Sequence, residues 1–419
     1  MTDGPNGTDQ PGTTPALLDY LSRNARWLAA GGLLTFLSGF GQTFFISIFA
    51  GEIRAEFGLS HGAWGGIYSL GTAVSAGVMI WAGALTDVFR VRVLGPVILV
   101  GLAGACIVMS VSSAIWVLPI SIFLLRFFGQ GMSSHIAVVA MARWFTATRG
   151  RALSIATLGF ALGEAVMPVL FVALMGWFNW RFLWVTGAVV CLVGVPILML
   201  LLRQERTPQS MAQGSASAGM NGRSWTRREA LFHPLFWFMV PALLGPSSFS
   251  TAFFFHQVHF AEIKGWAHVE LVAFFPVYTI MGIATMIGSG WALDRLGTAR
   301  LMPFFQLPLV VAFLAFSAAT GPVGALVGFL FLALTTGANS TLPNAFWAEF
   351  YGTAHIGAIK AMAAAVMVLG SAIGPGITGA LIDLGIGLEQ QFVWIAGYFL
   401  FATATMYVGI SRARKDLFP

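Results

Sequence analysis

Two ionisable side chains lie far from the ends of the apolar stretches that contain them. Arg126 is about 15 Å from the start of the stretch 116–142, and Glu164 is about 18 Å from the start of the stretch 152–175, if both stretches are helical. The other 36 of the 38 charged residues (22 basic, 16 acidic) lie where they can reach water. A charge deep in a membrane costs somewhere between roughly 2.5 and 17 kcal/mol, so it normally faces a cavity or a partner.

The chemistry of this pair suggests two roles. Arginine binds carboxylates because its planar guanidinium donates two parallel hydrogen bonds and stays protonated. A buried glutamate is suited to taking up and releasing a proton, because burial and a nearby cation shift its pKa in opposite directions. We therefore expect Arg126 to bind an anionic group and Glu164 to take up and release a proton. The alternative is a permanent Arg126–Glu164 ion pair that only fixes two helices.

Other polar side chains in apolar stretches are further candidates for a binding site. Gln130 follows Arg126 by one helical turn, which places both on one face. Tyr68 and Tyr278 either hydrogen-bond a substrate or pack at the membrane interface. The candidate substrate-binding residues are Arg126, Gln130, Gln42, Tyr68, His256, Gln257, Tyr278 and Asn339.

Motifs for metals, cofactors and catalysis are missing from the sequence. His256 and His259 are three residues apart, which suits either a metal site or the rim of a gate, but no third ligand follows at a matching spacing. There is no phosphate-binding glycine loop, nucleophile elbow, His-Glu-x-x-His or cysteine cluster. We therefore expect no metal, no cofactor and no enzymatic activity.

Composition identifies the elements that must position these residues. Charged residues make up 9% of the chain and hydrophobic residues 57%, whereas a water-soluble domain carries roughly 25% charged residues. The sequence predicts an all-α membrane protein, since long apolar runs satisfy their backbone as helices. The expected spans are 27–50, 64–85, 93–113, 116–142, 152–175, 180–202, 232–257, 268–292, 301–319, 323–345, 357–382 and 391–410.

The distribution of basic residues predicts the orientation of these twelve transmembrane helices. With the N-terminus inside, 18 of the 22 Lys and Arg residues lie on the inner side, three lie outside and Arg126 lies within a span. Both termini are therefore expected in the cytoplasm. The net charge of +6 then reflects topology and contact with membrane lipid, and not nucleic-acid binding.

Four sequence matches recur in one order, at a shift of 207 or 210 residues, and indicate an internal duplication. Gly83-x-x-x-Asp87 returns as Gly290-x-x-x-Asp294, for example. The duplication predicts two parallel six-helix pseudo-repeats related by an axis along the membrane normal. The expected parts are an N-terminal tail (1–26), an N-terminal bundle (27–202), a flexible cytoplasmic linker (203–229), a C-terminal bundle (230–410) and a C-terminal tail (411–419).

The two copies of the Gly-x-x-x-Asp repeat resemble a known loop motif. Gly83-Ala-Leu-Thr-Asp87-Val-Phe-Arg90-Val-Arg92 and Gly290-Trp-Ala-Leu-Asp294-Arg295-Leu-Gly297 are similar to the motif of the major facilitator superfamily. The resemblance covers residues 27–410 and implies the major facilitator fold. An aspartate at an inner helix end can pair with loop arginines and close the cytoplasmic side, so we expect gating by Asp87, Arg90, Arg92, Asp294 and Arg295.

A second resemblance narrows the expected substrate. Trp144-Phe145-x-x-x-Arg149-Gly150-Arg151 and the following glycines are similar to the helix 4–5 region of monocarboxylate and oxalate–formate carriers. It implies a proton-coupled symporter that takes up a small organic anion, a monocarboxylate, by alternating access. The alternatives are uptake of a neutral or aromatic solute such as a vitamin, efflux, or a membrane sensor or accessory subunit that does not transport.

The expected location follows from residue usage. Arg outnumbers Lys 19 to 3, which favours a GC-rich bacterial genome and hence a multi-pass protein of the bacterial inner membrane. The polar start of the chain shows no short apolar run with a cleavage site, so no cleaved signal peptide is expected. The expected partners are a small-molecule substrate, protons and lipid, with the protein acting as a monomer.

Overall fold

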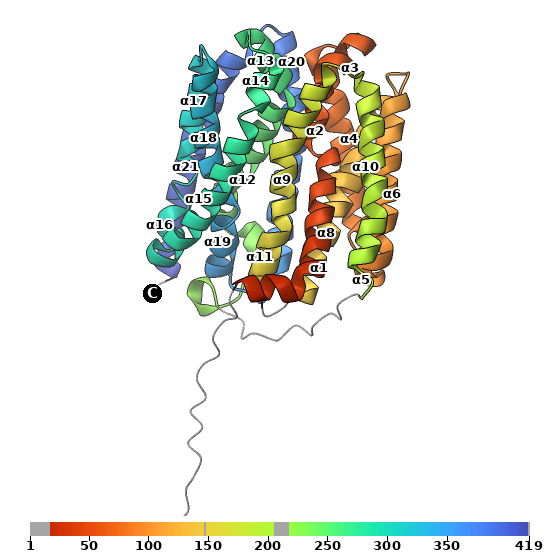
Figure 1. Ribbon diagram of the computed structural model, residues 1–419. Coiled ribbons are helices and arrows are strands. Elements are labelled where there is room, and N and C mark those ends of the chain that lie inside the picture. Colours follow the sequence, from red (N-terminus) through yellow and green to blue (C-terminus); the bar gives the residue numbers. More distant parts are fainter. Residues whose placement is uncertain (1–16, 146–147, 205–217, 418–419) are drawn as a thin grey trace, which may run out of the picture.

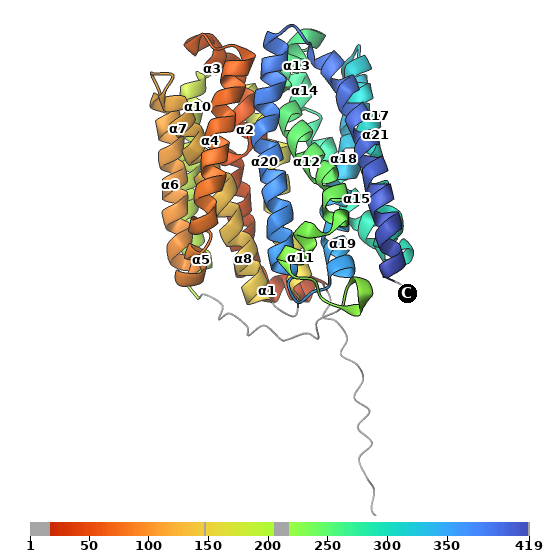
Figure 2. The ribbon, with the colours of Figure 1, turned by 180° about the vertical axis from the view of Figure 1, so that it is seen from behind.

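The computed structural model describes residues 17–145, 148–204 and 218–417, and the regular structure in those residues is entirely helical. Figures 1 and 2 show long helices standing side by side in one bundle. The long helices of the first half are α1 (Leu17–Leu37), α4 (His61–Ala82), α6 (Val91–Val111), α9 (Arg149–Met175) and α10 (Trp180–Leu201). Those of the second half are α12 (Pro234–Phe255), α15 (Phe275–Leu296), α18 (Pro322–Asn339), α20 (Ile356–Asp383) and α21 (Leu388–Ala413).

Shorter helical pieces complete several of the spans or lie in the segments that connect them. In the first half they are η1 (Ser38–Gly41), α2 (Thr43–Ile46), η2 (Ser47–Phe49), α3 (Ala50–Phe57), α5 (Leu85–Val88), α7 (Val117–Leu125), the π-helical η3 (Arg126–Ser133) and α8 (Ser134–Trp144). In the second half they are η4 (Met220–Gly222), α11 (Arg227–Phe232), α13 (Gln257–Lys264), α14 (His268–Val272), α16 (Thr298–Leu301), α17 (Leu307–Ala318), α19 (Leu342–Tyr351) and η5 (Arg414–Asp416).

The number of membrane spans is close to the sequence-based expectation. Ten of the described helices are long and apolar enough to cross a membrane, and an eleventh is added if the bent pair Asp19–Gly41 and Thr43–Phe57 is one span. The expected span 301–319 contains only α17, an apolar helix of 12 residues. The structure therefore supports ten or eleven of the twelve expected spans.

Both described ends of the bundle differ from the predicted tails. Helix α1 begins at Leu17, ten residues before the expected start, and Tyr20 on it is buried with its hydroxyl 3.1 Å from Thr148 Oγ1. Helix α21 continues to Ala413, past the expected end at 410. These turns are more polar than the spans, so hydropathy placed the helix ends too close to the apolar segments.

The start of α1 and the end of α21 lie at the same end of the bundle, the lower one in Figure 1. We call this the inner end, because the arginine-rich loops expected in the cytoplasm are there, and the opposite end the outer end. The first-half helices pack mainly on one another, for instance α6 on α10 and α1 on α9. The second-half helices do the same, for instance α15 on α18 and α17 on α21, and the halves meet mainly through α4 with α20 and α9 with α15.

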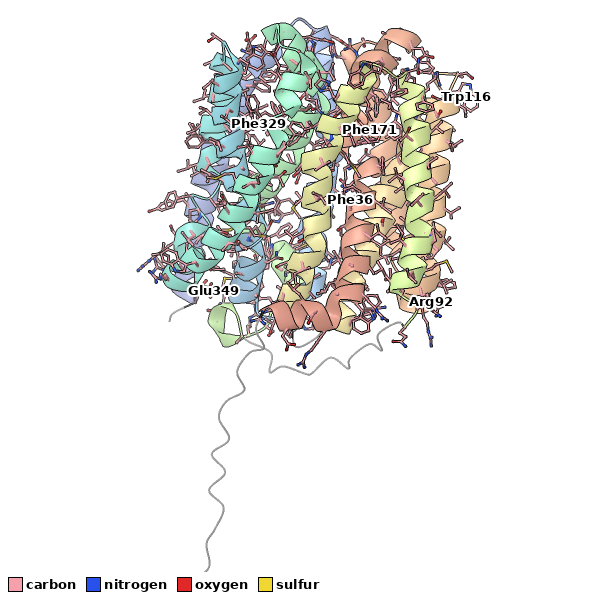
Figure 3. The ribbon with its side chains drawn as sticks, in the orientation of Figure 1. Phe36, Arg92, Trp116, Phe171, Phe329 and Glu349 are labelled. Atoms are coloured by element: carbon pink, nitrogen blue, oxygen red, sulfur yellow. The ribbon has the colours of Figure 1, made fainter. Side chains whose placement is uncertain are left out.

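Each half has its own aromatic core towards the outer end. Phe171 on α9 lies 4.8 Å from Phe45 and 6.0 Å from Phe40 between ring centroids. Phe329 on α18 lies 5.3 Å from Phe316 and 5.6 Å from Phe275. Figure 3 labels Phe171 and Phe329 in the upper part of the bundle, on different halves. Such edge-to-face clusters add to the apolar burial that holds each half together.

The connection between the halves is more structured than the flexible linker expected at 203–229. Residues 205–217 lie outside the described residues, but Trp225 is buried and its backbone N–H donates to the Tyr351 carbonyl at 2.9 Å. Helix α11 starts with a capping box of Thr226 and Glu229. Hydrogen bonds from the Thr226 backbone and hydroxyl, and then from Arg223, lower the pKa of Glu229 to about 2, so this exposed carboxylate is charged at neutral pH.

A close backbone contact in the first half breaks the first span and positions the candidate site. Gln42 has extended φ and ψ values of −89° and 153°, which separate η1 from α2. A Cβ on Gly41 would lie 2.1 Å from the Leu125 carbonyl oxygen, and one on Gly129 would lie 2.6 Å from the Gly41 Cα. Only glycine fits at both positions, so this pair lets η1 and η3 touch and brings the Gly41 carbonyl to Arg126.

This contact predicts the effect of adding one methyl group. Gly129→Ala should lower the melting temperature by several degrees, since overpacking against a backbone costs about 1–3 kcal/mol. Gly32→Ala is the matched control, because a Cβ there meets nothing within 4 Å. Thermal unfolding of the purified variants in detergent would measure both. Equal melting temperatures for the two variants would contradict the tight contact.

Candidate functional site

Arg126 begins the π-helical segment η3 and is 1% exposed. One terminal nitrogen donates to the Gly41 carbonyl oxygen at 3.3 Å and to Thr43 Oγ1 at 3.4 Å, and the guanidinium lies 5.5 Å from the centre of the Tyr68 ring. Its Nε has no hydrogen-bond partner among the described residues. None of the salt bridges between described residues includes Arg126. Within the described ranges the cation is therefore buried against neutral groups.

An aromatic cluster from both halves covers this site on its outer side. Tyr68 shares a hydrogen bond with Thr43, with 2.5 Å between the two hydroxyl oxygens. Phe255 of α12 packs on Tyr68 and Trp64 of α4, with ring centroids 4.6 and 5.7 Å apart. We call Trp64, Tyr68 and Phe255 the aromatic seal; all three are at most 1% exposed. The seal separates Arg126 from the outer end of the bundle.

Glu164 lies on α9 where the two halves meet. It is half-buried, and its Oε2 accepts a 3.5 Å hydrogen bond from Thr279 on α15 of the other half. Glu164 and Arg126 are both described, and no salt bridge joins them. This conformation therefore does not contain the Arg126–Glu164 ion pair of the alternative hypothesis. Sequence reasoning missed Thr279, because a single threonine in an apolar helix carries no signal of its own.

The remaining first-half candidates lie on either side of Arg126. Gln42 is buried at the break between η1 and α2, directly between Gly41 and Thr43. Gln130 lies one turn further along η3 and is exposed. Gln130 is therefore at the surface in this conformation, whereas Gln42 belongs to the buried surroundings of the guanidinium.

The second half contributes two polar candidates that line cavities. The Tyr278 hydroxyl donates to Thr336 Oγ1 at 3.1 Å, and both residues line a cavity of about 180 Å³. Asn339, at the end of α18, lines this cavity and a neighbouring one of about 270 Å³. Tyr278 and Asn339 are thus brought together by the fold, and their role in substrate binding stays a prediction.

His256 and Gln257 contact other parts of the protein at the outer end and do not line these cavities. The Gln257 side-chain amide donates to the Phe44 carbonyl at 3.2 Å and to Ser47 Oγ at 2.7 Å, and His256 Nε2 lies 3.0 Å from the Pro375 carbonyl oxygen. The ring of His61 on α4 is tilted by 51° against that of His259, with ring centroids 4.0 Å apart. Within the described ranges no group of three or more His, Cys, Asp or Glu residues has metal-binding geometry.

An aspartate that sequence reasoning missed closes the outer end. Asp383, at the end of α20, accepts hydrogen bonds from Ser60 Oγ at 2.6 Å, Gly62 N at 2.8 Å and His61 N at 3.1 Å. A carboxylate there satisfies the free N–H groups at the start of α4 and complements the helix dipole. Below it, a Cβ on Gly65 would lie 2.5 Å from the Pro375 carbonyl oxygen, so α4 and α20 are in backbone contact.

None of the salt bridges between described residues includes the expected gating residues Arg90, Arg92, Asp294 or Arg295. The Asp87 side chain lies outside the described part of the structure. Arg90, Arg92, Asp294 and Arg295 are exposed; Arg92 donates to the Arg203 carbonyl at 3.2 Å, and the Arg295 guanidinium lies 3.9 Å from the centre of the Trp291 ring. Figure 3 shows Arg92 at the inner end of one half and Glu349 at that of the other. The gating role stays a prediction.

Comparison with known proteins identifies the fold. A family model described as Major Facilitator Superfamily matches residues 31–375. The chain belongs to the Major Facilitator Superfamily. This is a family of transporters and not of enzymes, so the small-molecule substrate expected from the sequence follows from membership.

Two curated relatives of this superfamily member are named monocarboxylate transporter 13. The protein of Bos taurus is 24% identical over 290 residues and that of Rattus norvegicus is 23% identical over 291 residues. Each match covers 68% of this chain and 65% of the relative, so the chain matches just under two thirds of their length.

Solved structures show the same fold at low sequence identity. A bacterial homolog of the human lysosomal transporter Spinster, in an inward-facing and unoccupied conformation, aligns with a TM-score of 0.73 and 16% identity over 97% of this chain and 99% of that chain. The nucleoside transporter NupG aligns with a TM-score of 0.68 and 14% identity over 92% and 98% of the two chains. These likenesses establish the architecture of the superfamily member and leave its substrate open.

The outer contact of Asp383 predicts how the outer end opens. Asp383→Asn removes the charge and leaves one acceptor oxygen for three donors. At such an exposed site this should destabilise the closed conformation of the outer end by about 1 kcal/mol relative to the open one. The population of the open conformation should then rise about fivefold. Labelling of Ser69→Cys by an impermeant thiol reagent in right-side-out vesicles should then be about fivefold faster. The control is Asp19→Asn at the inner end; equal rates in both backgrounds would contradict a closing role for Asp383.

Proposed function

We propose that this chain is a secondary transporter that takes up a small organic anion, a monocarboxylate, together with a proton by alternating access. The observation that carries the proposal is Arg126, a buried guanidinium with a free Nε and no carboxylate partner among the described residues. Burying an arginine without a counter-ion is costly, and such residues in membrane proteins are normally functional.

A substrate carboxylate would complete the surroundings of Arg126. Its two oxygens can accept parallel hydrogen bonds from the guanidinium. In the present structure the guanidinium donates instead to the neutral oxygens of Gly41 and Thr43, over long distances of 3.3 and 3.4 Å. The name of the curated relatives, monocarboxylate transporter 13, supports the same substrate class. The π-helical form of η3 adds support, since such segments occur frequently at functional sites.

Glu164 is the proposed proton carrier because its hydrogen bond crosses between the halves. A protonated Glu164 can donate to Thr279, whereas an ionised one can only accept, so the protonation state affects a contact that joins α9 to α15. Movement of the halves changes that contact and hence the tendency of Glu164 to hold a proton. Such a residue links proton binding to conformation.

Alternating access is supported by where the halves touch. Asp383, the aromatic seal and Gln257 all join the halves at or near the outer end. We propose that the N-terminal bundle (27–202) and C-terminal bundle (230–410) rock about the site near Arg126 and Glu164, with Asp87, Arg90, Arg92, Asp294 and Arg295 pairing when the inner end closes. The protein would act as a monomer in the bacterial inner membrane, with both termini in the cytoplasm.

One observation favours a second candidate, the transport of a neutral polar solute. The cavity of about 180 Å³ is lined by the hydroxyl or amide groups of Ser247, Ser250, Tyr278, Thr335, Thr336 and Asn339, without a charged residue. Uncharged donors and acceptors suit a neutral solute as well as the uncharged part of an acid.

Proton movement in proteoliposomes tests the proposed function. Addition of the transported acid should make the outside more alkaline, because one proton enters with each anion. Glu164→Gln should abolish this signal while exchange of the acid for itself continues, because exchange needs no net proton movement. Lactate, pyruvate, formate, oxalate and aromatic acids form the test panel.

Glu270→Gln is the matched control for this experiment. Glu270 lies on α14 near the outer surface, and a glutamine there still accepts the backbone hydrogen bond from Ala267. The control should transport protons like the wild type. If no acid moves protons in the wild type, or if Glu164→Gln behaves like Glu270→Gln, proton-coupled uptake of an organic anion is the wrong function.

A further inference from the structure

The cavity of about 270 Å³ in the second half is built between broken helices. Its lining comes from α12, from the junction of α18 and α19, from the segment before α17 and from α20. The helix is interrupted between Asn339 and Leu342, inside a stretch that is otherwise one span from Pro322 to Tyr351. Irregular backbone at membrane depth is tolerated where it is buried in protein or lines a cavity, and interrupted helices are typical of substrate sites in transporters.

Side-chain hydrogen bonds hold the walls of this cavity in place. Pro246 has no N–H, so the Ala242 carbonyl one turn earlier loses its helical partner. The Gln306 side-chain amide supplies the missing donor at 2.6 Å. Thr335 donates to the Phe305 carbonyl at 3.1 Å, which fixes the adjacent wall. The cavity is thus shaped before any ligand arrives, and that lowers the entropic cost of binding.

The lining is amphipathic. Apolar side chains cover most of it: Met239, Leu243, Met302, Phe305, Trp347 and Met367. The polar groups are Ser247, Asn339 and Asn344, with Lys360 as the cation. Lys360 lies about 6 Å from the inner start of α20, so the positive charge is at the inner side of the cavity. A mainly apolar pocket with a few converging polar groups is the usual form of a small-molecule site.

The volume sets a lower limit on the size of a well-fitting ligand. About 270 Å³ is roughly nine times the ~30 Å³ that one water molecule occupies in the liquid. Lactate or pyruvate would leave much of this space unfilled and would place only one methyl group against Trp347 and the methionines. A ring or a branched chain would fill it and bury apolar area, which is the main source of affinity in such a site.

We propose that this cavity binds the body of an amphipathic organic acid, with an aromatic ring or branched chain against Trp347 and the carboxylate directed to Lys360. The inference rests on the proposed function and makes it narrower: the substrate is a monocarboxylate larger than a three-carbon acid. Arg126 and Lys360 then act at different stages, Arg126 beneath the aromatic seal and Lys360 at the inner side before release. Methionine side chains let the cavity adapt to ligands of similar size.

Binding to the purified full-length protein tests the proposal. Calorimetry would compare phenylacetate, 3-methylbutyrate and lactate with phenylacetamide, which has the same ring but no charge. Wild type should bind phenylacetate at least about tenfold more tightly than lactate or phenylacetamide. Trp347→Ala should weaken phenylacetate about tenfold, and Lys360→Gln should weaken phenylacetate but leave phenylacetamide unchanged.

Two further variants keep the result interpretable. Trp237→Ala is the matched control, since Trp237 on α12 is 58% exposed and does not line the cavity. Ala364→Phe fills the cavity without removing a wall and should block phenylacetate, so the test does not depend on Trp347→Ala folding. Equal binding of lactate and phenylacetate, or equal effects of Trp347→Ala and Trp237→Ala, would overturn the proposal.

The outcomes separate this inference from the proposed function. If lactate is transported with protons and phenylacetate is neither bound nor transported, the monocarboxylate function holds and only the larger substrate is wrong. If phenylacetamide binds as tightly as phenylacetate and Lys360→Gln changes nothing, the cavity selects a ring but not an acid, and the inference fails. If no acid is bound or transported at all, the proposed function fails as well.

Discussion

A guanidinium held inside a membrane protein, with no carboxylate partner in the part of the chain that the structure describes, is the constraint on which the rest of this structure depends. Arginine stays charged, so the protein cannot relieve the cost by releasing a proton. Arg126 is stabilised by a carbonyl, a hydroxyl and an aromatic face. The carbonyl is available because two glycines, Gly41 and Gly129, let the broken first span touch η3. Arg126 is therefore positioned by three features together: the helix break, the glycine pair and the π-helical turn.

The second important feature is the closed outer end, which covers the surroundings of Arg126. Asp383 receives hydrogen bonds from the start of α4, and Phe255 completes the seal over Tyr68. Both contacts join one half of the chain to the other, so separating the halves breaks both and exposes the surroundings of Arg126. Glu164 and Thr279 form a third contact of this kind, nearer to the middle of the membrane. Changes in charge near these contacts can therefore shift the balance between conformations.

The sequence predicted the helical membrane fold and the superfamily correctly, because apolar length, charge placement and the repeated loop motif are local patterns. It also singled out Arg126 and Glu164, whose roles stay predictions, since a charge in a long apolar run is visible without a structure. It did not predict Thr279 or Asp383 as partners, because their importance comes from packing between distant helices. The interruption between Asn339 and Leu342 and the short α17 were missed for a related reason: hydropathy averages over such breaks.

Thermal stability of the substrate-free protein with Arg126→Met tests the central claim most directly. If Arg126 is held for a ligand at a cost to folding, replacing it with an apolar side chain of similar length removes an uncompensated buried charge. The melting temperature should then rise by a few degrees, and binding of the organic acid should be lost. If Arg126 is a structural residue, the same variant should melt at a lower temperature than the wild type. A lower melting temperature with acid binding retained would contradict the account.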